Sequence, residues 1–184
     1  MGKILDAFKA AFQTRDIPKT PQGRFNALMR KEKGDTARVA ERLGISRRTV
    51  QRYVTGERKI AKTTVPEVLE RLEKEVTRDH QPRVRARAEK EARERGLQVE
   101  TRSAFGFTAA GNSTDSARVR RMAEDVPDHL IGDLFDALRD GNEDRLNELV
   151  GEALAEEYFR DHNTRASGLE VELKDIDYIE LDFR

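Results

Sequence analysis

Hydrophobic residues in the first eighty positions recur three and four apart, which is the spacing of helices that bury one face. One run precedes Pro18, a second follows the helix-start pair Thr20-Pro21, and a third begins at Pro66. Their apolar members are Ile4, Leu5, Phe8 and Phe12, then Phe25, Leu28 and Met29, then Val68, Leu69, Leu72 and Val76. These runs predict a helical domain over residues 1–80.

Residues 35–56 show a tighter pattern inside this domain. Ala40 is a small residue where two helices would cross, Gly44 accepts a positive φ at the turn, and Val50 is an apolar residue that buries against the first helix. Together they predict a helix-turn-helix whose second helix is capped by Ser46. The alternative is an ordinary helical hairpin with a solvated arginine face.

The second helix of this motif would present polar side chains to the base edges and phosphates of duplex DNA. The candidate DNA-binding residues are Ser46, Arg47, Arg48, Thr49, Gln51, Arg52, Arg58 and Lys59, with Lys62 beside them. Residues 46–49 would enter the major groove first, and the basic side chains beyond the motif would hold phosphates. The sequence therefore predicts DNA binding that weakens as salt rises.

A charged segment follows the helical domain. Residues 81–96 are rich in Arg, Ala and Glu and have almost nothing large to bury, so they predict a charged helical connector. Arg83, Arg85 and Arg87 either face solvent there or add phosphate contacts.

The last part of the chain mixes two periodicities. Alternation over residues 97–107 predicts one strand or a bent pair. Helical spacing and cap residues predict helices over 117–125, 127–139 and 143–159. The tail 169–183 alternates again, slips register near Asp175, and is expected to pair with 97–107 as a strand or hairpin. The predicted fold class is mainly α with a small β component: an N-terminal helix-turn-helix helical domain and an acidic α+β domain over 97–184.

Charge divides the chain, although its formal net charge is zero. Residues 1–100 hold 25 Lys+Arg and 15 Asp+Glu, net +10, and residues 101–184 hold 10 and 20, net −10. This asymmetry favours a nucleic-acid-binding half joined to an acidic half that faces protein or manages metal and phosphate. There is no cysteine and there are three histidines, so no metal site is expected. No apolar run approaches the roughly 20 residues that span a membrane, which favours a cytoplasmic protein.

Three features of the chain together resemble one family. They are the opening Met1-Gly2-Lys3-Ile4-Leu5-Asp6, the motif around Gly44-Ile45-Ser46, and the acidic stretch 169–183. Over nearly its whole length the chain resembles the telomere-associated terminal proteins of linear actinomycete (Streptomyces-type) chromosomes and plasmids. The resemblance implies covalent attachment to the 5′ ends of telomeric DNA and priming of end-patching synthesis. It also implies a nucleoid and telomere location, a second telomere-associated protein and a DNA polymerase as partners.

The resemblance implies that Thr114 is the hydroxyl that accepts the first nucleotide. Magnesium would enter with a deoxynucleoside triphosphate and the polymerase, and the chain would have no cofactor of its own. The residues alone favour a plainer role, in which Thr114 caps the helix expected over 117–125. At that helix start a phosphate would meet backbone N–H groups, with Arg118 and Arg121 as candidate phosphate contacts. Ser113 and Ser116 are rival acceptors.

Other functions remain open at this point. Asp175 and Asp177 could hold magnesium, although a solvated strand face is the commoner role for such a pair. A protein primer, the acceptor in the reaction, is expected rather than an enzyme. The main alternative is a helix-turn-helix transcriptional repressor whose C-terminal half dimerises or senses a ligand, and a homodimer is possible. A further alternative is a scaffold that recruits replication proteins through its acidic half.

Overall fold

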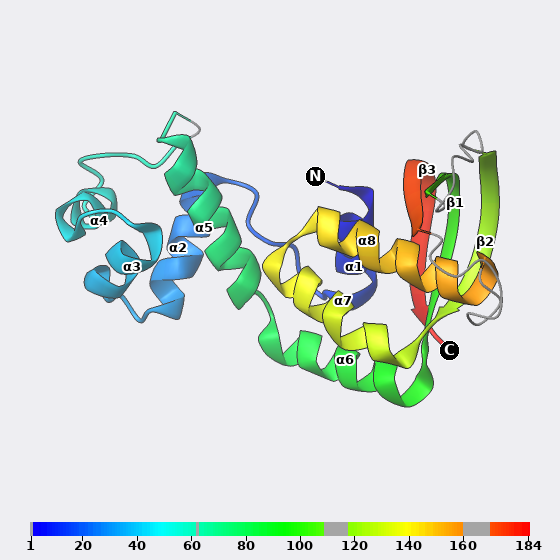
Figure 1. The fold of residues 1–184 in the computed structure, drawn as a ribbon. Helices are drawn as coiled ribbons and strands as arrows, with labels where there is room; N and C mark the ends of the chain where they lie inside the picture. Colours follow the sequence, from blue (N-terminus) through cyan, green and yellow to red (C-terminus); the bar gives the residue numbers. More distant parts are fainter. Residues whose placement is uncertain (1, 62, 109–117, 160–169) are drawn as a thin grey trace. The chain divides into compact units, whose positions relative to one another are not determined.

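The computed structural model describes residues 2–61, 63–108, 118–159 and 170–184 (Figure 1). The chain divides into two compact units. Arg15–Pro82 form the helical unit, and Met1–Thr14 together with Arg83–Arg184 form the α+β unit. The predicted fold class is confirmed: the described residues are mainly helical, with one small antiparallel sheet.

The helical unit contains the four helices that the apolar spacing predicts between Pro21 and Asp79. They are α2 (Pro21–Lys31), α3 (Thr36–Leu43), α4 (Arg47–Val54) and α5 (Pro66–Asp79). Thr20 caps α2 by accepting a hydrogen bond from the Gly23 backbone N–H at 3.0 Å, with Pro21 at the first helical position. One apolar core joins the four helices: Phe25, Leu28, Val39, Ala40, Leu43, Val50, Tyr53, Ile60, Leu72 and Val76.

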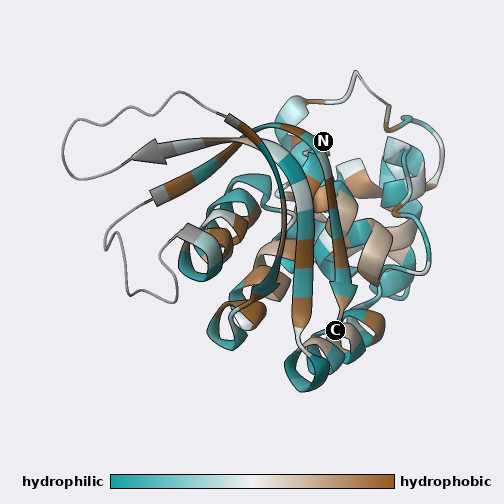
Figure 2. Cartoon of the chain, turned by 90° about the vertical axis from the view of Figure 1, so that its right-hand side faces the viewer, coloured by the Kyte–Doolittle hydropathy of each residue, from teal (hydrophilic) through white to brown (hydrophobic). Residues whose placement is uncertain are grey.

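The α+β unit has helices against one face of a three-stranded sheet (Figures 1 and 2). Its helices are α1 (Lys3–Phe12), α6 (Pro82–Arg95), α7 (Asp128–Asp140) and α8 (Glu143–Leu154), and a π-helical turn at Ala155–Phe159 extends α8. Its strands are β1 (Leu97–Thr108), β2 (Arg118–Val126) and β3 (Glu170–Phe183), in the antiparallel order β2-β1-β3. Hydrophobic and hydrophilic residues alternate along the strands in Figure 2, so each strand turns one face to the helices.

Helix α1 belongs to the α+β unit, which changes the expected boundary of an N-terminal domain over 1–80. Its apolar face, Ile4, Leu5, Phe8 and Phe12, is buried in the same core as α7, α8 and the sheet. The ring of Phe12 lies 5.2 Å from that of Phe135 and 5.3 Å from that of Phe183. The expected connector over 81–96 is also part of this unit, because Ala88 and Ala92 of α6 are buried in its core.

A carboxylate from a distant helix caps α1. Glu143, in the first turn of α8, accepts hydrogen bonds from the backbone N–H groups of Ile4 at 3.1 Å and Leu5 at 2.7 Å. These bonds satisfy donors at the start of α1 that have no partner within the helix. A Cβ at residue 2 would overlap the Glu143 carboxyl group, so Gly2 leaves room for this cap.

Strand β3 pairs with β1 along its length, as the alternation of the tail predicts. The register shifts between Arg102 and Ala104, which face Tyr178 and Lys174 respectively. Three β3 residues therefore lie opposite Ser103, and Asp175 adopts a positive φ of 46°. The predicted slip near Asp175 is thus a β-bulge. Thr101 is buried beside the bulge, and its hydroxyl donates a hydrogen bond to the Tyr178 carbonyl oxygen at 2.9 Å. The bond gives this backbone acceptor a partner.

The helix predicted over 117–125 is wrong, because residues 118–126 form strand β2. Val119, Met122 and Val126 are three and four apart, which reads locally as one helical face. In the structure Val119 is 60% exposed whereas Met122 and Val126 are buried, as expected for a strand. Pairing with β1, in register from Leu97–Val126 to Phe105–Arg118, overrides the local spacing.

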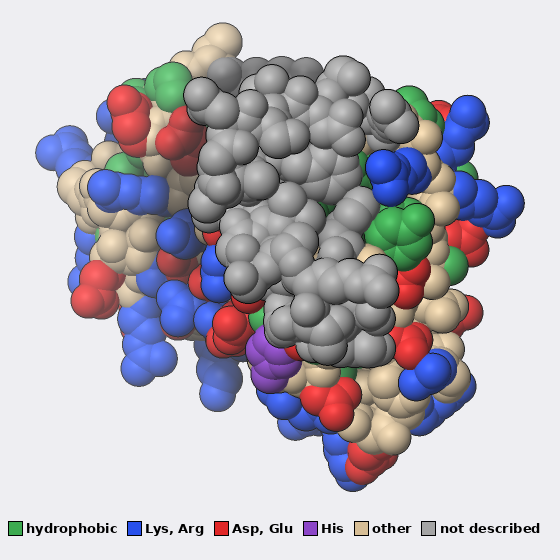
Figure 3. Space-filling model, turned by 45° about the vertical axis from the view of Figure 1, so that its right-hand side comes forward, with side chains coloured by type: hydrophobic (Ala, Val, Ile, Leu, Met, Phe, Trp, Pro, Cys, Tyr) green, Lys and Arg blue, Asp and Glu red, His purple; other side chains and the backbone are tan. Residues whose placement is uncertain are grey.

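Charged side chains of both signs are scattered over the described surface on the face shown in Figure 3. The two units have net charges of opposite sign. The sequence of the helical unit, 15–82, holds 17 Lys+Arg and 10 Asp+Glu, net +7. The sequence of the α+β unit holds the remaining 18 and 25, net −7. Among the described residues, no helix is long and apolar enough to cross a membrane.

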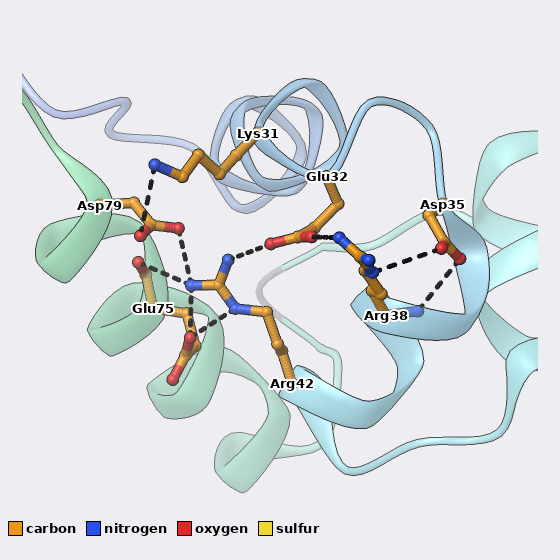
Figure 4. Close-up of polar contacts among 7 residues, drawn as sticks. All are labelled: Lys31, Glu32, Asp35, Arg38, Arg42, Glu75 and Asp79. Carbon is orange, nitrogen blue, oxygen red and sulfur yellow. Dashed lines mark hydrogen bonds and ion pairs between the residues drawn. The ribbon is translucent and has the colours of Figure 1, made fainter.

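One arginine ties α3 to both of its neighbours in the helical unit (Figure 4). The Nη1 of Arg42 lies 2.6 Å from Glu32 at the end of α2, and its Nε donates to Glu75 of α5 at 2.6 Å. Its Nη2 lies 2.7 Å from Asp79. These carboxylates raise the pKa of Arg42, and its side chain is only 20% exposed. Arg42 is the common cation of three acidic groups.

We expect Arg42→Ala to destabilise the helical unit. Removal of the guanidinium leaves Glu75 without its ion-pair partner, and it leaves Glu32 and Asp79 with only the longer 3.9 Å contacts to Arg38 and Lys31. The free energy of unfolding should fall by about 2–4 kcal/mol, somewhat less than for a fully buried pair because Arg42 keeps some solvent contact. Urea denaturation followed by circular dichroism measures the change. Arg139→Ala, which breaks exposed pairs with Asp136 and Asp140, is the control and should shift the midpoint little.

Two helical glycines of the α+β unit should respond in opposite ways to alanine. A Cβ on buried Gly151 of α8 would overlap the carbonyl oxygen of Val171 in β3, and a backbone atom cannot move aside cheaply. Gly151→Ala should therefore lower the free energy of unfolding by about 1–3 kcal/mol. At Gly132 of α7 a Cβ would meet only the flexible end of Arg93, so Gly132→Ala should be neutral or stabilising. Equal thermal midpoints for the two variants would contradict the close approach of α8 to β3.

Candidate nucleic-acid interface

The turn between α3 and α4 is built around one left-handed residue. Gly44 has a φ of 65°, a conformation that glycine adopts without a steric penalty. The Ile45 N–H donates to the Ala40 carbonyl at 3.0 Å and the Gly44 N–H to the Glu41 carbonyl at 3.1 Å. These two bonds close the end of α3 and turn the chain into α4. The predicted helix-turn-helix over 35–56 is confirmed in its geometry.

Side-chain caps define the start of both helices of the motif. Asp35 accepts hydrogen bonds from the backbone N–H groups of Ala37 at 2.8 Å and Arg38 at 3.2 Å, and these bonds lower the pKa of Asp35. Ser46 caps α4 by accepting from the Thr49 N–H at 3.2 Å, and its hydroxyl lies 2.9 Å from that of Thr49. The predicted cap at Ser46 is therefore present.

Two buried side chains fix which face of α4 points outward. Val50 and Tyr53 are buried in the core of the helical unit, and the Tyr53 ring meets Phe25 edge-on at 5.7 Å. At 100° per residue, Arg48 and Arg52 lie on the side opposite these two, and both are exposed. Gln51 is exposed beside them, whereas Thr49 is half-buried. The outward face of α4 thus carries the polar groups suited to base edges.

The other predicted DNA-binding residues lie at the borders of this face. The Arg47 Nε donates to the hydroxyl of Thr36 in α3 at 3.1 Å, which holds this arginine toward the first helix of the motif. Thr36 was not predicted, because its role depends on how the two helices pack. Arg58 lies over the Tyr53 ring at 5.7 Å, and Lys59 is exposed.

Most of the predicted priming site lies outside the residues that the structure describes. Thr114 and its rivals Ser113 and Ser116 lie outside the described residues, between β1 and β2 in the sequence. The described strand that begins at Arg118 replaces the expected helix, so the argument from a helix start beside Thr114 no longer holds.

Arg121 has a partner within the sheet. Its Nη2 lies 2.6 Å from Glu100 of β1, and the Tyr178 hydroxyl donates to the same carboxylate at 2.8 Å. Both donors lower the pKa of Glu100, with Arg121 the larger cause. Arg121 therefore forms an ion pair on the outer face of the sheet, and a phosphate there would share it with Glu100.

Among the described residues, neither Asp175 nor Asp177 belongs to a cluster that could hold a metal ion. Asp177 pairs with Arg102 at 2.9 Å, and Asp175 lies in the β-bulge. Across the ranges that the structure describes, no group of three or more His, Asp or Glu side chains is arranged to hold a metal ion.

Comparison with known proteins identifies the helical unit. Residues 27–77 match the helix-turn-helix family of the Cro/C1 type, a DNA-binding domain. Neither a curated protein nor a solved structure matches the chain. The match covers α3, the Gly44 turn and α4, and it ends within α5. The chain therefore carries a Cro/C1-type helix-turn-helix domain and is a DNA-binding protein.

Proposed function

We propose that the protein is a terminal protein that binds the duplex ends of a linear replicon through α4 and accepts a deoxynucleotide on Thr114. The observation that carries the DNA contact is the exposed Arg48, Gln51 and Arg52 face of a capped helix-turn-helix. In the major groove arginine suits guanine and glutamine suits adenine. The basic charge of the helical unit supports the phosphate contacts.

Support for priming comes from the sequence resemblance described above. In the reaction the Thr114 oxygen attacks the α-phosphorus of a deoxynucleoside triphosphate, a new P–O bond forms and pyrophosphate leaves. The hydroxyl proton passes to solvent or to a base of the polymerase. Magnesium arrives with the nucleotide and a DNA polymerase, and a second telomere-associated protein brings the chain to the overhang. The chain itself contributes the acceptor and the duplex contact.

A helix-turn-helix repressor is the second candidate, and the match of residues 27–77 favours it equally. In that function the α+β unit would dimerise or bind a ligand. A repressor dimer would bind two half-sites about one helical turn apart on a palindromic duplex, and no nucleotide would become attached to the protein.

Arg48→Ala combined with Arg52→Ala should weaken duplex binding at least tenfold. Loss of two cationic contacts should also reduce the slope of log affinity against log salt by about 0.9 per phosphate contact removed. Fluorescence anisotropy with a labelled duplex over a salt series measures both quantities. The control is Lys19→Ala with Lys74→Ala, which removes the same charge from the helical unit at exposed positions outside the motif. An equal loss of duplex affinity in both variants would mean that α4 contributes only to the net charge of the unit and makes no specific contact.

Thr114→Ala should abolish attachment of a labelled deoxynucleotide and leave duplex affinity unchanged. The purified chain is incubated with cell extract, telomeric template, magnesium and one labelled deoxynucleotide at a time, and label on protein is read by denaturing gel and mass spectrometry. Ser113→Ala and Ser116→Ala are matched controls that should keep the label. Label retained by Thr114→Ala would assign the acceptor elsewhere. No label on the unmodified chain, with active extract and intact duplex binding, would favour the repressor.

A further inference from the structure

Helix α6 is a basic element in an acidic unit. Its sequence holds six Lys+Arg and three Asp+Glu, while the α+β unit as a whole has a net charge of −7. The three glutamates lie in the second half of the helix, and all three pair with basic residues there. The pairs are Glu89–Arg93 at 3.0 Å, Glu91–Arg95 at 2.7 Å and Lys90–Glu94 at 3.6 Å. The charge of α6 is therefore balanced only in its C-terminal half.

The N-terminal half of α6 leaves positive charge exposed. Arg83 and Arg87 lie one turn apart, both are exposed, and neither has an ion pair with any residue that the structure describes. Lys90, which pairs with Glu94, follows on the same face one turn further along and is exposed. Ala86, small and exposed, lies between them. Buried Ala88 and Ala92 hold the opposite face in the core, which fixes this stripe toward solvent.

This arrangement opposes the local electrostatics of the helix. Cations are unfavourable in the first turns of a helix, where the N-terminal end of the macrodipole is positive. Two like charges at positions i and i+4 also repel each other. The sequence has no acidic residue in the first turn to offset either effect. An external anion that binds Arg83 and Arg87 would relieve both.

We propose that the α6 stripe, Arg83, Arg87 and Lys90, is a second surface of the chain that binds the phosphate backbone of duplex DNA. This inference rests on duplex binding by α4. The stripe spans about 10 Å along the helix, a length over which duplex DNA presents roughly six phosphates. Its charge complements that backbone, and contacts made only to phosphates are independent of the DNA sequence.

Helix α6 directly follows the DNA-binding unit in the sequence. Only His80 and Gln81 separate the end of α5 from the start of α6.

Arg83→Gln combined with Arg87→Gln in the full chain tests the inference. The probe is a mixed-sequence duplex of about 30 base pairs, long enough for three helical turns, and binding is measured by anisotropy over a potassium chloride series. The salt slope should fall by about 1.8 in magnitude, and affinity should weaken about tenfold or more near 0.1 M salt. The loss should be the same on any duplex sequence. The thermal midpoint without DNA should stay level or rise, because the two repulsive effects are removed.

The matched control is Arg139→Gln with Arg145→Gln, which removes the same charge from paired arginines of α7 and α8. It should leave the salt slope unchanged, and an equal loss in this control would overturn the inference in favour of net charge alone. An unchanged slope in the α6 variant, alongside weak binding by the α4 variant, would also overturn it and indicate an acidic protein partner for α6. If the α4 variant binds normally as well, the assignment of α4 fails rather than that of α6.

Discussion

The placement of α4 depends on one backbone constraint, the left-handed conformation of Gly44. Any side chain there would be strained by the positive φ, and a Cβ would also overlap the guanidinium of Arg71. The sharp turn lets Val50 reach the core while Arg48 and Arg52 face solvent. Arg42 then locks α3 to the helices on either side. The DNA-binding face thus results from a turn that favours glycine and a cation that joins three helices.

The helices of the helical unit and their exposed polar face could be predicted from the sequence, because the interactions that define them are local. Apolar spacing, Ser46 and Gly44 act within a few residues of one another, so the motif and its exposed polar residues follow from the pattern. Strand β2 could not be predicted in this way. Its apolar residues have helical spacing, and only pairing with β1 places Val119 in solvent. The hydrogen bonds of the Glu143 cap link residues separated by 138 and 139 positions in the sequence. No local sequence pattern could predict contacts over that separation.

The two units have opposite charges and separate chemistry. The helical unit has side chains that bind an anionic duplex, and the α+β unit pairs many of its charges internally, as Arg121–Glu100 and Arg102–Asp177 illustrate. An acidic unit is repelled by DNA unless some part of it is locally basic. The basic half of α6 lies at the junction between the two units in the sequence, where attraction to phosphate would offset that repulsion.

The burial of α1 makes the helical unit an insertion within its neighbour, since the chain leaves the α+β unit after Thr14 and returns at Arg83. This order has a consequence for synthesis. Residues 15–82 can form their own core as soon as they leave the ribosome, whereas α1 emerges first and must wait for β3. At roughly 5–20 residues per second that wait is on the order of ten seconds. Until α7, α8 and β3 emerge, the apolar face of α1 with Phe8 and Phe12 lacks its partners, which makes the N-terminal helix a natural site for a chaperone to hold the nascent chain.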